Sequence, residues 1–200
     1  TRCISSCLAP LLIGEDAHDV TRLWQRVARH PALQWVGRAG ITTLAHAAID
    51  IALWDVKAKS ARLPLWKLLG GSASKRVEAY NTDGGWLNWP TETLVADCKR
   101  LVESEGYRGV KIKIGSSEPV RDIERIEAVR RAIGPRNKLM IDANGKLDLP
   151  AAVQIGRRLR DYDVVWFEEP IWYDDVAGHA QLARSIDTPA VFSFIGAVPR

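Results

Sequence analysis

The run Val164-Val165-Trp166-Phe167-Glu168-Glu169-Pro170 decides the predicted fold, because an apolar strand ends there in two acids and a proline. Two related runs precede it along the chain. Leu139-Met140-Ile141-Asp142-Ala143-Asn144 ends in an acid and an amide, and Val110-Lys111-Ile112-Lys113-Ile114-Gly115 carries two lysines on one side of a strand. The polar residues recur at intervals of about 26 to 29 residues, which is typical of successive βα units in a (β/α)8 barrel.

Strands and helices alternate along the second part of the chain. Further strands are predicted at 77–80 and 190–194, which gives about five βα units. The turn Asn81-Thr82-Asp83-Gly84-Gly85 lacks the glycine pattern of a dinucleotide-binding sheet, so we expect an α/β fold with a partial (β/α)8 (TIM-like) barrel. The predicted helices cover residues 91–104, 118–133, 149–160 and 175–185.

The first part of the chain has a different pattern, with no such alternation. Apolar positions at helical spacing predict helices over 16–29 and 42–60, and Gly70-Gly71 then interrupts the chain. We therefore expect two domains, a mainly helical one over 1–72 and the first part of the barrel over 73–200.

Composition excludes several classes of protein. The 200 residues are 46% hydrophobic and 26% charged, which indicates a globular chain, and no apolar run reaches the roughly 20 residues of a membrane span. The net charge of +4 comes from scattered residues, so we expect no nucleic-acid surface. The three cysteines lack the spacing of a zinc site, and the first residues lack the apolar core of a signal peptide. Both observations predict a cytoplasmic protein with reduced thiols. The absence of a starting Met predicts a fragment.

The polar strand ends together predict a metal site. Each motif alone also has a structural interpretation. A Lys-x-Lys strand is typical of a sheet edge with a solvated face, and an acid or Glu-Glu-Pro after a strand is typical of a helix cap or a turn. All three lie at the same end of consecutive units, where barrel enzymes place their chemistry. Asp142 and Glu168 would offer oxygen ligands to Mg²⁺, and Lys113, with Lys111 beside it, would remove a proton next to a carboxylate through an enediolate.

The chain resembles the mandelate racemase/muconate lactonizing enzyme group of the enolase superfamily over roughly residues 8 to 189. The resemblance rests on Gly40–Ala45, Ala48–Asp55 and Leu63–Gly71, which are similar to the helices of that group's α+β capping domain and to the entry into its barrel. It rests equally on Gly109–Gly115, Met140–Gly145 and Trp166–Pro170, which are similar to its lysine strand and its first two metal strands. The resemblance implies that residues 1–72 are a remnant of the capping domain.

The resemblance also implies residue roles. Lys113 is implied as the base, Lys111 as the contact of the substrate carboxylate, and Asp142 and Glu168 as ligands of Mg²⁺. Asn144 and Glu169 are implied as neighbours of the site. The loop after the first predicted strand adds Asn81 and Thr82 as candidates for substrate contact, because it lies at the functional end.

The implied reaction is removal of the proton α to a carboxylate. The Asp174–Ala180 segment resembles acid-sugar dehydratases, so we expect dehydration of a sugar acid, with racemisation or epimerisation of a 2-hydroxy acid as the alternative. Phe194 stands where the group supplies a third carboxylate, and the last three strands are absent. We therefore expect weak metal binding by this truncated chain alone, and an inactive remnant is a further alternative. The full-length family member is expected to be a homo-oligomer.

Overall fold

The structure is a computed structural model that describes residues 2–34 and 40–192. These residues form two compact units, which divide between Arg76 and Val77. None of the helices in the described ranges has the length and apolar character needed to cross a membrane. Each unit is considered by itself below.

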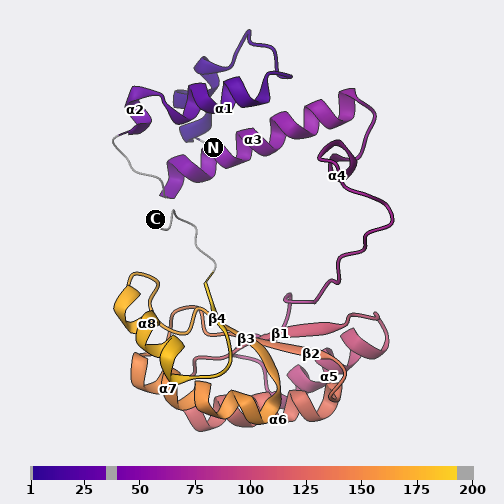
Figure 1. The fold of residues 1–200 in the computed structure, drawn as a ribbon, viewed down its shortest axis with the longest axis vertical. Coiled ribbons are helices and arrows are strands. Elements are labelled where there is room, and N and C mark those ends of the chain that lie inside the picture. Colours follow the sequence, from indigo (N-terminus) through magenta and orange to yellow (C-terminus); the bar gives the residue numbers. More distant parts are fainter. Residues whose placement is uncertain (1, 35–39, 193–200) are drawn as a thin grey trace. The chain divides into compact units, whose positions relative to one another are not determined.

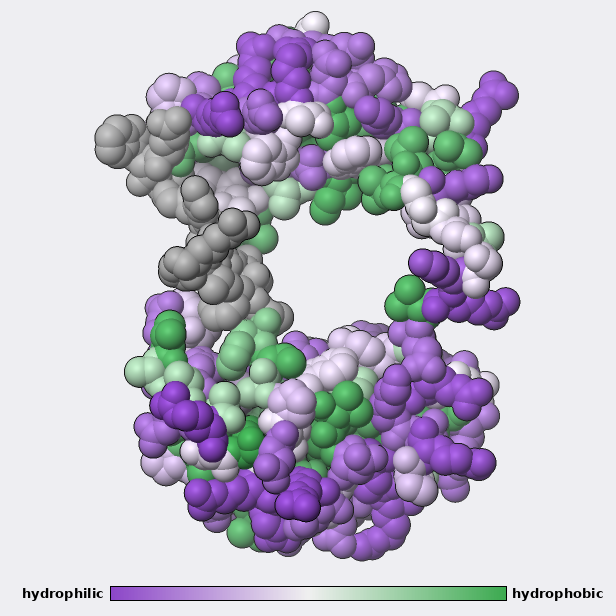
Figure 2. Space-filling model, viewed as in Figure 1, coloured by the Kyte–Doolittle hydropathy of each residue, from purple (hydrophilic) through white to green (hydrophobic). Residues whose placement is uncertain are grey.

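The first unit is helical. Leu8, Val27 and Ala45 are buried together at its centre, and Leu23 of the same helix as Val27 is also buried. The helix predicted over 16–29 is shorter in the structure, and the one predicted over 42–60 starts two residues earlier. Figure 2 shows hydrophobic surface over the third and fourth α-helices. The elements are a π-helix η1 (Ile4–Leu8), a 3-10 helix η2 (Ala9–Leu11), α1 (Val20–Ala28), α2 (Pro31–Gln34), α3 (Gly40–Ser60) and α4 (Leu65–Leu68).

The second unit is a parallel four-stranded sheet in the order β1-β2-β3-β4. Figure 1 shows its helices gathered on one face of the sheet. This alternation of strand and helix confirms the predicted parallel βα architecture. The strands are β1 (Gly109–Lys113), β2 (Lys138–Asp142), β3 (Val164–Glu168) and β4 (Ala190–Val191), and the helices are α5 (Thr91–Glu103), α6 (Pro119–Ile133), α7 (Leu149–Arg158), the 3-10 helix η3 (Leu159–Tyr162) and α8 (Val176–Ser185).

Local sequence explains where the helices of this unit begin and end. Asp148 caps α7, because its side chain accepts a hydrogen bond from the Ala151 amide at 2.8 Å. Asp175 caps α8 in the same way through the Gly178 amide at 2.8 Å. Gly134 ends α6 with a φ of +72°, a backbone conformation that favours glycine.

The register of the strands brings the predicted site residues to one level. Lys113 pairs with Asp142, and Asp142 pairs with Glu168. Because side chains alternate along a strand, Val110 and Ile112 point to the opposite face, where they are buried in the apolar core.

The prediction of a strand at 77–80 is wrong. Among the described residues, this segment joins the sheet only through an isolated bridge from Asn81 to Val110, and Val77 is 93% exposed. The Asn81 backbone makes one pair of ladder bonds, to Gly109 at 3.0 Å and from Lys111 at 2.8 Å. In the part of the chain that the structure describes, no strand pairs with the residues before it, so they do not join the sheet. The last predicted strand begins at Ala190 as expected, but Phe194 lies outside the described residues.

Candidate active site

Two lysines and two acids form a continuous chain of ion pairs at the carboxyl ends of β1, β2 and β3. Lys113 Nζ lies 2.6 Å from Asp142 Oδ2, and Lys111 Nζ lies 2.6 Å from Glu168 Oε2. Lys111 Nζ is also 3.7 Å from Asp142 Oδ2, so Lys111 links the two carboxylates. The structure thus brings together the four residues that the sequence singled out for metal binding and proton transfer.

These four side chains lie largely out of solvent. The side chain of Asp142 is 3% exposed and that of Lys111 is 8% exposed. Burial alone would lower the pKa of Lys111, but the hydrogen bond that Lys111 donates to Glu168 and the negative charges of Glu168 and Asp142 outweigh it. The pKa of Lys111 is therefore held above its ordinary value, and Lys111 is a cation in this arrangement.

Asn144 and Glu169 lie directly beside this cluster. Asn144 donates its backbone amide to Asp142 Oδ1 at 2.9 Å, and its Nδ2 donates to Asp142 Oδ2 at 3.2 Å and Glu169 Oε2 at 3.3 Å. Both residues have positive φ, +48° for Asn144 and +42° for Glu169. The hydrogen bond between their side chains joins the loops that follow β2 and β3.

Aromatic residues that the sequence reasoning did not assign also border the cluster. Trp166 Nε1 donates to Glu168 Oε2 at 3.2 Å. Lys111 Nζ lies 5.9 Å from the centre of the Tyr80 ring, and Lys113 Nζ lies 5.8 Å from the centre of the Trp86 ring. The alternation of side chains along a strand predicts Trp166 on the same face as Glu168, because it stands two positions earlier on that strand.

The structure does not bring Asn81 and Thr82 into the cluster through their side chains. Asn81 Oδ1 accepts a hydrogen bond from the Asp83 amide at 2.9 Å, so its side chain stabilises its own turn. Thr82 is exposed, and the described part of the chain gives it no hydrogen bond to the cluster. Asn81 touches the site through its backbone, which pairs with Lys111.

The carboxylates of Asp142 and Glu168 suit a hard divalent cation. Their oxygens already converge on one positive group, the Lys111 ammonium, at 3.7 and 2.6 Å. Mg²⁺ prefers such oxygen donors and keeps several waters when a protein supplies one or two carboxylates. Within residues 2–34 and 40–192 no cluster of three His, Cys, Asp or Glu side chains could hold a metal, so a complete site needs ligands besides these two.

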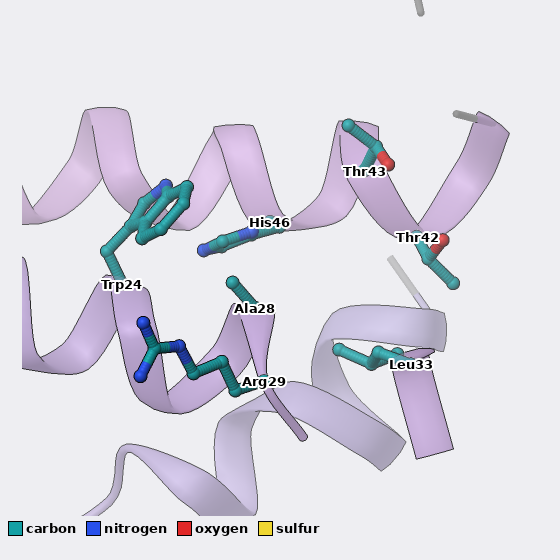
Figure 3. A pocket seen from close by; sticks show the side chains of 7 residues that line it. All are labelled: Trp24, Ala28, Arg29, Leu33, Thr42, Thr43 and His46. Atoms are coloured by element: carbon teal, nitrogen blue, oxygen red, sulfur yellow. The ribbon is translucent and has the colours of Figure 1, made fainter. Parts of the chain in front are cut away.

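A separate pocket of about 550 Å³ lies in the first unit and contains none of the predicted site residues. Figure 3 shows the His46 ring of α3 facing the Trp24 ring of α1, with 5.2 Å between ring centres. Burial lowers the pKa of His46, although the charge of Asp50 opposes the shift. The pocket is lined by Trp24, Ala28, Arg29, Leu33, Thr42, Thr43 and His46.

The parallel βα units and their polar strand ends define a partial barrel of the (β/α)8 class. The chain belongs to the mandelate racemase/muconate lactonizing enzyme group of the enolase superfamily. Residues 93–192 match the enolase C-terminal domain-like family, and residues 1–70 match the mandelate racemase/muconate lactonizing enzyme N-terminal domain. The family resemblance seen in the sequence is therefore confirmed.

Known relatives agree with this assignment. An L-talarate/galactarate dehydratase of Salmonella typhimurium strain LT2 is 41% identical over 91% of this chain and 45% of its own length. An L-talarate dehydratase from Polaromonas sp. JS666, solved with Mg and L-glucarate, is 42% identical with a TM-score of 0.83, over 93% of this chain and 51% of that one. A racemase from Streptomyces coelicolor A3(2), solved with bound magnesium, is 34% identical with a TM-score of 0.88. The match covers 96% of this chain and 52% of the racemase chain. The chain spans about half the length of these relatives.

Proposed function

We propose that this chain carries the first part of an active site that removes the proton α to a carboxylate with the help of Mg²⁺, and that the reaction is dehydration of an acid sugar. One observation carries the proposal: Lys113 and Asp142, and Lys111 and Glu168, meet at 2.6 Å on the ends of three adjacent strands. The dehydratase relatives, one of them solved with Mg and L-glucarate, support both the metal and the substrate class.

Asp142 and Glu168 would hold the metal. With Mg²⁺ held there, the metal would supply a positive charge that polarises the substrate carboxylate and would stabilise the negative charge developing beside it. Asn144 keeps the Asp142 carboxylate in place through its two hydrogen bonds. Trp166 does the same for Glu168 through its indole N–H.

Lys113 is the proposed base, and it accepts the α-proton only as an uncharged amine. In the structure its ammonium pairs with Asp142, so Lys113 must leave that contact and give up a proton to solvent before it can accept the α-proton. Lys111, a cation held by Glu168, is the proposed contact of the substrate carboxylate. The two lysines therefore have different roles although they stand on the same strand face.

The second candidate reaction is racemisation or epimerisation of a 2-hydroxy acid or related carboxylate, which the racemase relative favours. Dehydration needs a general acid for the departing hydroxyl, whereas racemisation needs a second base on the opposite face of the substrate. An inactive remnant is the further alternative for this half-length chain. We also propose Asn81 and Thr82 as contacts of the bound substrate, a cytoplasmic location, and a homo-oligomer for the full-length family member.

Titration calorimetry with MgCl₂ tests the proposal. Two carboxylates bind Mg²⁺ weakly, so we expect a dissociation constant on the order of millimolar, weakened at least about tenfold by Asp142→Asn or Glu168→Gln. Glu127→Gln on the exposed side of α6 is the matched control and leaves the affinity unchanged. Equal affinity in the wild type and both site variants would contradict the proposed metal site.

A panel of acid sugars separates the reactions. Dehydration removes one water from the substrate, which mass spectrometry detects, and racemisation leaves the mass unchanged while exchanging the α-proton with solvent. Absence of both signals in the presence of bound Mg²⁺ would favour the inactive remnant.

A further inference from the structure

Two buried charged residues of α6 take no part in the cluster of lysines and acids. Asp122 is 0% exposed and Arg125 is 1% exposed, and they stand three positions apart on the helix. Taking charged groups out of water is costly unless hydrogen bonds compensate. The partners of these two side chains therefore show what the burial achieves.

Arg125 holds the loop that precedes α5. Its guanidinium donates to the Trp89 carbonyl at 2.8 Å and to the Trp86 carbonyl at 3.0 Å. The planar guanidinium has a fixed fork of donors, so it fixes both carbonyls at once. A single side chain of α6 thus sets the path of residues 86–89.

Asp122 holds the loop that follows β1. Its Oδ2 accepts hydrogen bonds from the Gly115 and Ser116 amides, both at 3.0 Å. Gly115 has a φ of +98°, a conformation that side-chain-bearing residues rarely adopt, so the turn needs both the glycine and its acceptor. This turn begins two residues after Lys113.

Both loops meet at Lys113. The Lys113 amide donates to the Gly85 carbonyl at 3.1 Å, and the Lys113 ammonium lies 5.8 Å from the Trp86 ring centre. The loop is closely packed there, since a Cβ on Gly85 would lie 3.0 Å from Ile112 Cα. The backbone and the side chain of Lys113 are therefore both in contact with a loop that Arg125 holds.

We propose that Arg125 and Asp122 are positioning residues for Lys113: Arg125 places Trp86 and the Gly85 carbonyl against it, and Asp122 fixes the turn on its other side. Their importance for catalysis rests on the proposed function, in which Lys113 is the base. The positioning itself requires neither metal nor substrate.

The same helix supplies a matched control. Arg130 of α6 is half-buried and also donates to backbone carbonyls, those of Gly134 at 2.9 Å, Asn137 at 2.7 Å, Tyr162 at 2.8 Å and Asp163 at 2.9 Å. These carbonyls lie before the amino ends of β2 and β3, away from Lys113. Loss of Arg130 should therefore weaken the unit without moving the loop that carries Trp86.

The experiment compares Arg125→Met with Arg130→Met in the full chain without metal. Fluorine NMR of chains labelled with 5-fluorotryptophan follows Trp86, whose signal is assigned by its loss in Trp86→Phe. Hydrogen exchange read by NMR follows the Lys113 amide. We expect Arg125→Met to shift or broaden the Trp86 signal and to speed Lys113 exchange at least about tenfold relative to Arg130→Met. Asp122→Asn should speed exchange of the Gly115 and Ser116 amides.

Unchanged Trp86 and Lys113 signals in Arg125→Met, or equal changes in Arg130→Met, would overturn the proposal. If Arg125→Met does not fold, Arg125→Lys takes its place, because lysine keeps the charge but cannot span both carbonyls; a wild-type Trp86 signal in that variant would equally overturn the proposal. Because no metal or substrate is present, failure here differs from failure of the proposed function. Loss of Mg²⁺ binding with intact Trp86 and Lys113 responses would contradict only the proposed function.

Discussion

The two faces of the parallel sheet differ sharply, although they come from the same strands. The face under α5–α8 is apolar, with Val110, Ile112 and Phe167 at most 1% exposed. The other face carries the ion pairs of Lys111 and Asp142 with their partners. Because side chains alternate along a strand, each strand serves both faces. We infer that the first face supplies stability and the second supplies chemistry, so substitutions should separate the two.

The largest expected effect is on the apolar face. Phe167→Ala removes a side chain that is 0% exposed, so we expect the free energy of unfolding to fall by about 3–5 kcal/mol. Val165→Ala on the same strand, where Val165 is 38% exposed, should cost less than about 1 kcal/mol. Urea unfolding measures both, and equal losses would show that burial does not decide the cost of a substitution on this strand.

The next effect is on the polar face, where a substitution should lower stability but strengthen Mg²⁺ binding. Lys113→Met removes the ammonium that competes for Asp142 Oδ2, so we expect Mg²⁺ to bind on the order of tenfold more tightly, while the metal-free fold loses stability. Calorimetry at fixed ionic strength measures the change, with the exposed Lys99→Met as control. Weaker binding by Lys113→Met would show that the ammonium does not compete with the metal.

A smaller effect distinguishes structural from functional polar residues at the same end of the sheet. Asp148 follows β2 but caps α7, so Asp148→Ala should cost about 1 kcal/mol of stability and leave Mg²⁺ affinity unchanged. Thermal unfolding measures the stability, and titration calorimetry on the same sample measures the Mg²⁺ affinity. A changed Mg²⁺ affinity would place Asp148 among the functional residues.

The smallest effect tests how well the apolar core excludes water from the Cys98 thiol. Burial, chiefly, raises the pKa of Cys98 to about 12, while an unfolded thiol has a pKa of about 8.5. The folded state therefore keeps a proton that the unfolded state loses. This contribution is complete below about pH 8.5, loses under about 1 kcal/mol by pH 9, and continues to fall as pH rises toward 12. The stability difference between wild type and Cys98→Ala, measured from pH 7 to 9, should shift accordingly; a constant difference would contradict it.

The sequence predicted the parallel units and the meeting of Lys111, Lys113, Asp142 and Glu168, because strand alternation and the interval between units are local signals. The strand at 77–80 was predicted wrongly, since pairing depends on a neighbouring strand and not on the segment itself. Asn144 and Glu169 directly follow the ends of β2 and β3, so the predicted strand ends also place these two residues beside the site.

The charged residues of α6 illustrate what sequence reasoning cannot reach. Asp122 and Arg125 have the spacing of an ordinary solvated helix face, yet both are buried. The hydrogen-bond partners of Arg125 are the Trp86 and Trp89 carbonyls, which lie more than 35 residues away in the chain. No local pattern reports such a contact, so only the tertiary structure reveals it.

We propose above that Asp142 and Glu168 together hold a divalent cation beside Lys113. A crystal structure of the chain grown with MgCl₂ tests it most directly. We expect an ion about 2.0–2.1 Å from one carboxylate oxygen of each acid, with the Lys113 ammonium moved away from Asp142. An ion bound elsewhere, or both lysine–carboxylate pairs intact at saturating Mg²⁺, would contradict it.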